Sequence, residues 1–259
     1  MLKGLYTAHT GLRNEQNRMD IMTNNLANAS TVGYKKEGST SQSFGDVLAV
    51  KVKDASIGLA IRQPIGINNP GVKIGENYTD FTQGSMRITD NTFDLAISGE
   101  GFFAIEFTNK AGETSTKYTR AGDFTLNKDG YLVTNEGDYV LDVNSKRIQI
   151  NPLADTAIKK DGSIEQNGVK IAQIGLVDFA DYDYLEKYGE TYYEAVEGAE
   201  FITSDADIYS GYLEMSNVQV VSEMVEMINI TRQYESNQKI MQTYDSSLEI
   251  AVNQLGRVK

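Results

Sequence analysis

The first thirty residues carry large apolar side chains at intervals of seven. A second row, three positions further on, is also apolar and is interrupted only by Glu15. A helix returns its side chains to the same face every seven residues, so this spacing predicts a helix over residues 4–29 with a narrow apolar stripe. The two rows consist of Leu5, Leu12, Met19 and Leu26, and of Ala8, Met22 and Ala29.

A longer series of the same period lies at the other end of the chain. Its members are Leu213, Val220, Met227, Tyr234, Met241, Leu248 and Leu255. The series predicts a helix over residues 216–255, with Ser216 or Asn217 as its N-cap. Further apolar residues, among them Val221, Val225 and Ile228, lie beside this row and widen the stripe.

The middle of the chain has the period of β-strands. Apolar residues alternate at Phe103, Ile105 and Phe107, and later apolar runs are separated by turn signals such as Asn167-Gly168. Residues 76–212 are therefore predicted to form a mainly antiparallel β domain. Residues 31–75 show no sustained period, and we expect an extended linker or a loose hairpin there.

Together these elements predict an α+β fold. Isolated helices of this length need partners for their apolar stripes, so the two terminal helices are expected to pair as a coiled-coil-like axial domain built from residues 1–30 and 213–259. Val221, Val225 and Ile228 would still form a second apolar surface, which suggests a homo-oligomer or polymer. The alternative is that both helices pack on their own β domain. The predicted assembly interface consists of Leu5, Leu12, Met19, Met22, Leu26, Val220, Met227, Tyr234, Met241, Leu248 and Leu255.

Charge and composition exclude several functional classes. The chain has 24 basic and 36 acidic residues, a net charge of −12 that disfavours nucleic acid and anionic membrane surfaces as partners. It contains no Cys, so disulfides, thiolate catalysis and zinc–thiolate sites are excluded. No apolar run is long enough for a membrane span, and the first thirty residues lack a secretory signal. The acidity is concentrated in residues 76–212, which carry 11 basic and 25 acidic residues.

Candidate catalytic and ligand-binding motifs are weak. The spacing of Gly99, Gly101 and Ala104 resembles a dinucleotide-binding turn, but a strand follows where that motif requires a helix. Asp178, Asp181 and Asp183 lack the glycine and the glutamate of a calcium loop, and His9 is the single histidine. We therefore predict no catalytic, cofactor-binding or metal-binding residues. A cell-wall glycosidase using β-domain carboxylates, or an adhesin-like binding module, are the alternatives of a different class.

Three stretches of the chain resemble the bacterial flagellar basal-body rod and hook proteins. One is the end of the first predicted helix together with the residues that follow it, and one is the stretch from Asp94 to Phe103, which continues to Val133. The third is the start of the second predicted helix. The residues that carry the first and third are Asn24, Asn25, Asn28, Gly33, Tyr34 and Lys35, and Ser216, Asn217, Arg232, Tyr234 and Asn237.

The resemblance implies a non-enzymatic structural subunit of the flagellar basal body, exported without a cleavable signal peptide by the flagellar type III apparatus. It implies assembly into a helical tube that transmits torque and forms part of the export channel. The implied partners are further copies of the chain, other axial proteins of the proximal rod and hook, and the outer ring proteins. Room for a single β domain implies one of the two rod proteins that carry one such domain. Of these two we favour the distal rod, and a proximal rod or short hook-type subunit is the alternative.

Overall fold

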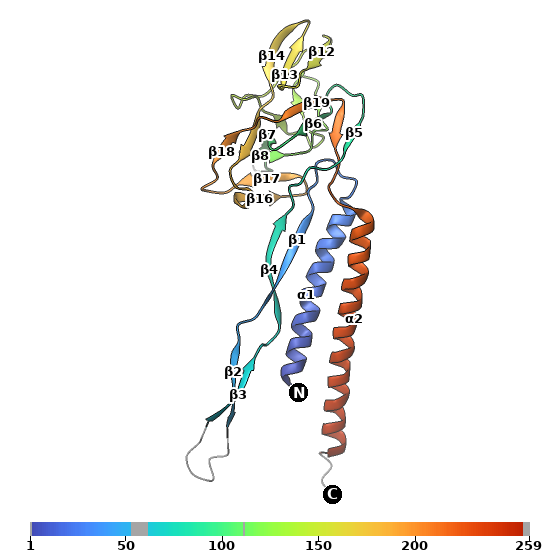
Figure 1. Ribbon diagram of the computed structural model, residues 1–259. Helices are drawn as coiled ribbons and strands as arrows, with labels where there is room; N and C mark the ends of the chain where they lie inside the picture. The colour runs from blue at the N-terminus through green and yellow to red at the C-terminus, as the bar shows by residue number, and fades with distance from the viewer. Residues whose placement is uncertain (1, 53–61, 111, 256–259) are drawn as a thin grey trace. The chain divides into compact units, whose positions relative to one another are not determined.

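A computed structural model describes residues 2–52, 62–110 and 112–255 of the chain (Figure 1). These residues form two compact units. Unit 1 consists of residues 1–26, 37–78 and 220–259, and unit 2 of residues 27–36 and 79–219. Unit 1 contains 11 basic and 11 acidic residues, whereas unit 2 contains 13 basic and 25 acidic residues, so the whole net charge of −12 belongs to unit 2.

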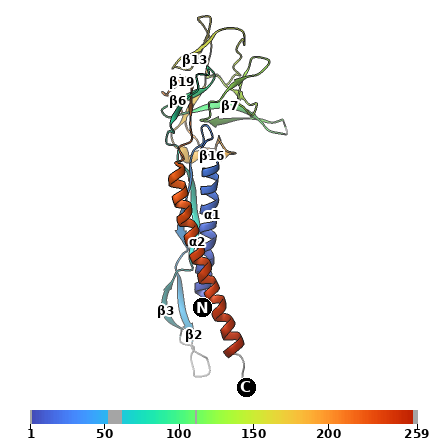
Figure 2. The same ribbon diagram turned by 90° about the vertical axis from the view of Figure 1, so that its right-hand side faces the viewer.

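Two antiparallel helices run side by side in unit 1 (Figures 1 and 2). They are α1 (Leu2–Ala27) and α2 (Val220–Ile250), and α2 ends in a π-helical turn, Ala251–Leu255. Small residues of α1 face larger residues of α2, because a Cβ atom on Gly4 would lie 2.2 Å from the Tyr244 hydroxyl and one on Gly11 would lie 3.0 Å from the Asn237 amide. Glycine on one helix therefore lets the other approach closely.

A long two-stranded ribbon completes unit 1. Strand β1 (Glu37–Ser43) pairs with β4 (Val72–Thr79), and the ribbon continues as the antiparallel pair β2 (Val47–Val52) and β3 (Arg62–Asn68). Polar contacts join the ribbon to α1: the Asn14 side-chain amide donates to Ser41 Oγ at 3.0 Å, and that of Asn25 donates to the Glu37 carbonyl at 2.8 Å. Of the segment expected to be a linker or loose hairpin, residues 53–61 lie outside the described part.

Unit 2 is built from antiparallel strands. The largest sheet has the order β16-β17-β8-β7-β11-β10-β9, and β15 joins β7 to β18. Its strands are β7 (Phe102–Thr108), β8 (Thr114–Thr119), β9 (Thr125–Leu126), β10 (Leu132–Val133), β11 (Tyr139–Val140), β15 (Leu176–Phe179), β16 (Leu185–Tyr188), β17 (Tyr192–Ala195) and β18 (Phe201–Thr203). The smaller sheets contain β5 (Met86–Ile88) with β20 (Tyr212–Glu214), β6 (Leu95–Ser98) with β19 (Asp207–Ser210), and β12 (Thr156–Ile158), β13 (Ser163–Gln166) and β14 (Val169–Gln173).

Alternation along β7 divides the interior of unit 2 into two clusters. Phe103 packs with Leu95, Ile97 and other aliphatic residues on one face of the strand, whereas Phe102 and Ala104 pack with an aromatic cluster on the other. The predicted turn at Asn167-Gly168 joins β13 to β14, and both residues have positive φ angles, as a two-residue type I′ hairpin requires. The Asn-Gly turn signal therefore marked this hairpin correctly.

The predicted fold class is confirmed: the N- and C-terminal helices are in contact and flank a central antiparallel β region. The start of the second helix was predicted wrongly. Leu213 lies in β20 and pairs with Arg87 of β5, and α2 begins only at Val220, so neither Ser216 nor Asn217 is its N-cap. Leu213 is apolar because it is buried within unit 2 as part of a strand. Its place in the seven-residue series of α2 is therefore a coincidence.

Candidate assembly face and buried ion cluster

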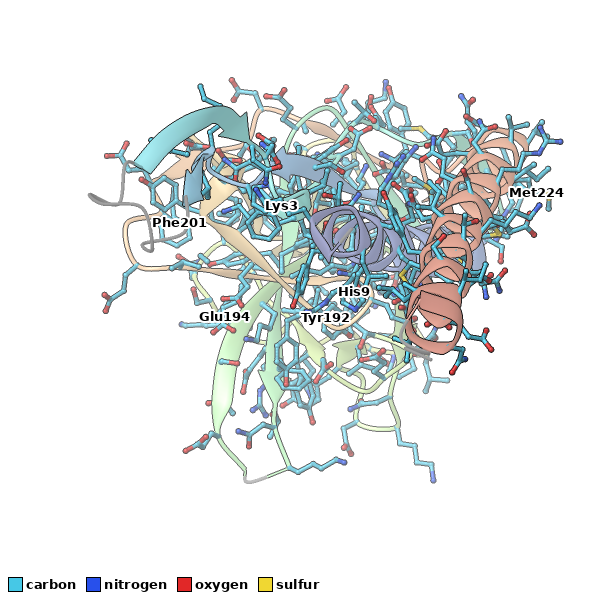
Figure 3. All side chains as sticks on the ribbon, turned by 90° about the horizontal axis from the view of Figure 1, so that it is seen from below. Lys3, His9, Tyr192, Glu194, Phe201 and Met224 are labelled. Carbon is cyan, nitrogen blue, oxygen red and sulfur yellow. The ribbon has the colours of Figure 1, made fainter. Side chains whose placement is uncertain are left out.

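The first turns of α2 expose a group of large apolar side chains, which we call the outer patch (Val220, Val221, Met224, Val225 and Ile228). Val221 is the most exposed, at 77% of its accessible surface. Seen along unit 1, Met224 lies on the side of α2 turned away from α1 (Figure 3). Solvated helix faces are normally polar, so a contiguous apolar group of this kind indicates a surface that another molecule covers.

Four of the six predicted interface residues of α2 lie on a different face. Met227, Tyr234, Met241 and Leu248 are half-buried and share their helix face with Asn237 and Tyr244, which approach α1. Of the remaining two, Val220 belongs to the outer patch, and the side chain of Leu255 lies outside the described part. In α1, the predicted residues Leu5, Leu12, Met19, Met22 and Leu26 are all half-buried. Most of the predicted interface is therefore already half-buried within the chain, and four of its α2 residues lie on the face that approaches α1.

A polar contact between the helices explains the break in the apolar row of α1. Glu15 is buried and accepts a hydrogen bond from Arg18 at 3.1 Å, and Arg18 reaches across to Glu226 of α2 at 2.6 Å. Glu15 thus holds the guanidinium group that links the two helices. The sequence showed Glu15 only as an interruption and gave no indication of its partner.

A second group of charged residues is buried within unit 2, and we call it the buried ion cluster (Lys35, Arg120 and Glu214). The Lys35 ammonium lies 2.6 Å from Glu214 Oε1, and Arg120 Nη1 lies 3.4 Å from Glu214 Oε2. Each of the three side chains is at most 3% exposed. One carboxylate therefore serves two cations that have almost no access to water.

Burial disfavours the positive charges of the buried ion cluster, whereas neighbouring groups stabilise them. Burial lowers the pKa of Lys35, and the neighbouring Glu214 carboxylate opposes that shift. The Arg120 guanidinium lies 5.1 Å from the centre of the Phe102 ring, so its charge is also stabilised by an aromatic face. Removing one partner of such a group leaves an uncompensated buried charge, at a cost of about 3–5 kcal/mol.

Besides the segment that carries Arg120, three segments of unit 2 meet at the buried ion cluster. Glu214 Oε1 accepts the Gly84 N–H at 2.9 Å, and the Glu214 carbonyl accepts the Gly33 N–H at 2.8 Å. The Asn217 side chain accepts the Lys36 N–H and donates to the Asp80 carbonyl, both at 2.8 Å. Hydrogen bonds thus join three segments to one another: residues 33–36, 80–84 and 214–217.

The residues that carry the family resemblance differ in their exposure. Five of them are buried: Asn25, Asn28, Tyr34, Lys35 and Ser216. Two others, Gly33 and Asn217, belong to the segments that hydrogen bonds join at the buried ion cluster. Tyr34 is covered by Lys187, whose ammonium lies 4.3 Å from the ring centre. Asn24 and Arg232 are exposed, and Tyr234 and Asn237 are half-buried on α2. Glu214 and Arg120, which complete the buried ion cluster, were not predicted as site residues.

Family comparisons match three regions of the chain. Residues 5–35 match the family described as "Flagella basal body rod protein", residues 96–174 match the "Flagellar hook protein FlgE/F/G D1 domain", and residues 209–255 match the "Flagellar basal body rod FlgEFG protein C-terminal". Among the helices of the described residues, none is both long and apolar enough to cross a membrane.

Individual relatives are similar over nearly their full length. The chain is 36% identical to the flagellar basal-body rod protein FlgG of Bacillus subtilis (strain 168), with 98% of this chain and 99% of the relative covered. It is 35% identical to the rod protein FlgF of Caulobacter vibrioides, with both chains fully covered. A third relative, the flagellar hook-basal body complex protein FlhO of Bacillus subtilis, is 30% identical, again with both chains fully covered.

Proposed function

Because the chain belongs to the FlgE/F/G family of flagellar basal-body rod proteins and is a structural subunit of that rod, we propose that it forms the distal rod by polymerising with itself. The distal position is supported by the similarity to FlgG, and the similarity to FlgF makes the proximal rod the alternative. The chain acts as a mechanical element and not as an enzyme.

The outer patch is the observation that carries the proposal. A fully exposed valine, isoleucine or methionine side chain gains about 1.5–3 kcal/mol when it is moved into a packed interface. The three valines, one isoleucine and one methionine of the outer patch can therefore hold two copies together. Unit 1 has equal numbers of basic and acidic residues, so little net repulsion opposes the packing of its helices.

The position of the outer patch favours an open polymer over a closed dimer. The patch occupies the first turns of α2, whereas the exposed Ile250 and Val252 lie at its other end. Contacts between unlike surfaces of identical subunits continue indefinitely unless a rotation closes them into a ring. A head-to-tail contact between these two ends would build a helical array.

The assembly surface can be tested without disturbing the helix pair. We expect Val225→Asp to leave the isolated chain folded, because Val225 is exposed, and to prevent rod formation, because a charge cannot be buried there unpaired. The measurement is electron microscopy of basal bodies isolated from cells that carry only the variant. Gln242→Asp is the matched control, since Gln242 is an exposed polar residue further along α2.

The proposal predicts rods of normal length for Gln242→Asp and no distal rod for Val225→Asp. Normal rods in cells with Val225→Asp would reject the outer patch as the assembly surface. Labelling the chain in the same basal bodies also locates it: label near the hook supports the distal position, and label near the inner end supports the proximal one.

Further partners follow from the same proposal. A distal rod subunit would contact the hook, the proximal rod and the surrounding outer rings, and would reach its place through the flagellar type III export apparatus. A hook-basal body relative, FlhO, supports a place within this complex. The proposed mechanical role is torque transmission through the packed helices.

A further inference from the structure

The buried ion cluster joins segments that are far apart in the sequence. Glu214 is 179 positions from Lys35, 130 from Gly84 and 94 from Arg120, and it contacts all three. By contrast, the β7–β8 pair forms through a short loop, with Thr108 opposite Thr114. Closing a long loop costs more chain entropy and is slower than closing a short one.

Charge balance makes Glu214 the deciding member of the buried ion cluster. The cluster holds two cations and one carboxylate, and Asp80 is the one other carboxylate whose charge acts on Lys35. Without Glu214, burying Lys35 and Arg120 would remove two positive charges from water with no ion-pair partner at hydrogen-bond distance. Residues 33–36 and Arg120 can therefore take their buried positions only together with Glu214.

Glu214 also ends the last strand of unit 2. Strand β20 (Tyr212–Glu214) adds to β5, the Met215 N–H donates to the Ser85 carbonyl at 2.8 Å, and α2 begins five residues later at Val220. The residue that neutralises the buried cations is thus delivered by the same segment that leads into α2.

We propose that the buried ion cluster is a late-closing lock, which keeps residues 33–36 and 80–84 open until residues 212–217 dock. Unit 2 then completes its fold in the same event that fixes the start of α2. A chain whose residues 212–217 have not yet docked cannot finish unit 2, although the β7–β8 pair, which needs only a short loop, can already form. The inference concerns the order of folding and stands independently of the proposed assembly.

Refolding of the full-length chain with pulsed hydrogen exchange tests the order directly. We expect the amides paired between β7 and β8 to gain protection first, and those of Gly33, Gly84 and Met215 to gain it later and together. Early protection of Gly33 and Gly84, alongside β7 and β8, would overturn the proposal.

The folding and unfolding rates of variants give a second test of this order. Glu214→Gln should accelerate unfolding about 100-fold while changing refolding less than about twofold, because a contact made after the transition state affects only the unfolding rate. Glu165→Gln is the control, since it removes a carboxylate whose partner, Lys159, is exposed to water. It should change both rates less than about twofold. A Glu214→Gln variant that slows refolding and leaves unfolding unchanged would contradict late closure, as would one that changes neither rate.

Lys35→Met is a second variant, on which the same measurements can be made if Glu214→Gln does not fold. It leaves one cation with one carboxylate, so it should unfold more slowly than any Glu214 variant and should still protect Gly33 and Gly84 late. Equal damage from removing Lys35 and from removing Glu214 would show that charge balance does not govern the cluster.

Discussion

Replacing Gly33 by alanine is expected to destabilise unit 2 by more than about 3 kcal/mol. Gly33 has a φ angle of +68°, and a Cβ atom there would lie 2.2 Å from the Ala121 nitrogen and 2.5 Å from the Arg120 carbonyl carbon. Both are backbone atoms that no side-chain rotation can move. The clash would push Arg120 away from Glu214 and break the hydrogen bond from the Gly33 N–H to the Glu214 carbonyl.

Urea unfolding of the full-length chain, followed by the near-ultraviolet circular dichroism of its tyrosines, measures this effect. Gly189→Ala is the matched control, because Gly189 has a similar φ angle of +72° and nothing within 4 Å of the Cβ position. The control should lose only the cost of the strained backbone, about 1 kcal/mol. Similar losses for the two variants would show that close packing at Gly33 is unimportant.

Ile230→Ala is expected to destabilise the helix pair by about 2–5 kcal/mol. Ile230 is fully buried, the one apolar side chain in the described part of α2 that is. Its truncation leaves a cavity at a fully buried position of α2, which belongs to unit 1. The loss should therefore appear in the helical signal of the far-ultraviolet circular dichroism before the tyrosine signal of unit 2 changes.

Ile240→Ala makes the same chemical change on the same helix at a residue that is 43% exposed. It should alter stability by less than about 1 kcal/mol. If both isoleucine variants lowered the helical melting temperature equally, α2 would not be held by the buried face that the structure describes.

The period of the apolar residues predicted both helices but could not show which face meets which partner. On α2, the row from Met227 to Leu248 and the group around Val225 both repeat at helical spacing, and each could serve as an interface. The structure separates them, because Gly4 and Gly11 of α1 approach Tyr244 and Asn237. Glycine does not register as part of an apolar stripe, so the close approach of the helices was invisible in the hydrophobic pattern.

The buried ion cluster could be predicted only in part. Lys35 was singled out through the family resemblance, but nothing local to Lys35 indicates that its partner is 179 positions away. Charged residues are normally exposed, so Glu214 and Arg120 had no distinguishing pattern of their own. Local periodicity predicts elements well, whereas pairing between distant charges depends on how the strands bring them together.

Leu213 shows the opposite failure. It fits the seven-residue series in perfect register, yet it is a strand residue buried beside Glu214 in β20. A series can extend past the end of a helix when the next element also needs an apolar residue. Gly211 before it, and the polar residues Ser216, Asn217 and Gln219 after it, are better markers of where the helix begins.

Assembly of copies of this chain through the outer patch of α2 is the proposal on which its role in the rod depends. Electron microscopy of the concentrated purified protein, with helical reconstruction of any polymer, tests it most directly. We expect tubes in which a neighbouring copy covers Val221, Val225 and Ile228. Tubes in which these three side chains face solvent, or a chain that remains monomeric at every concentration, would contradict it.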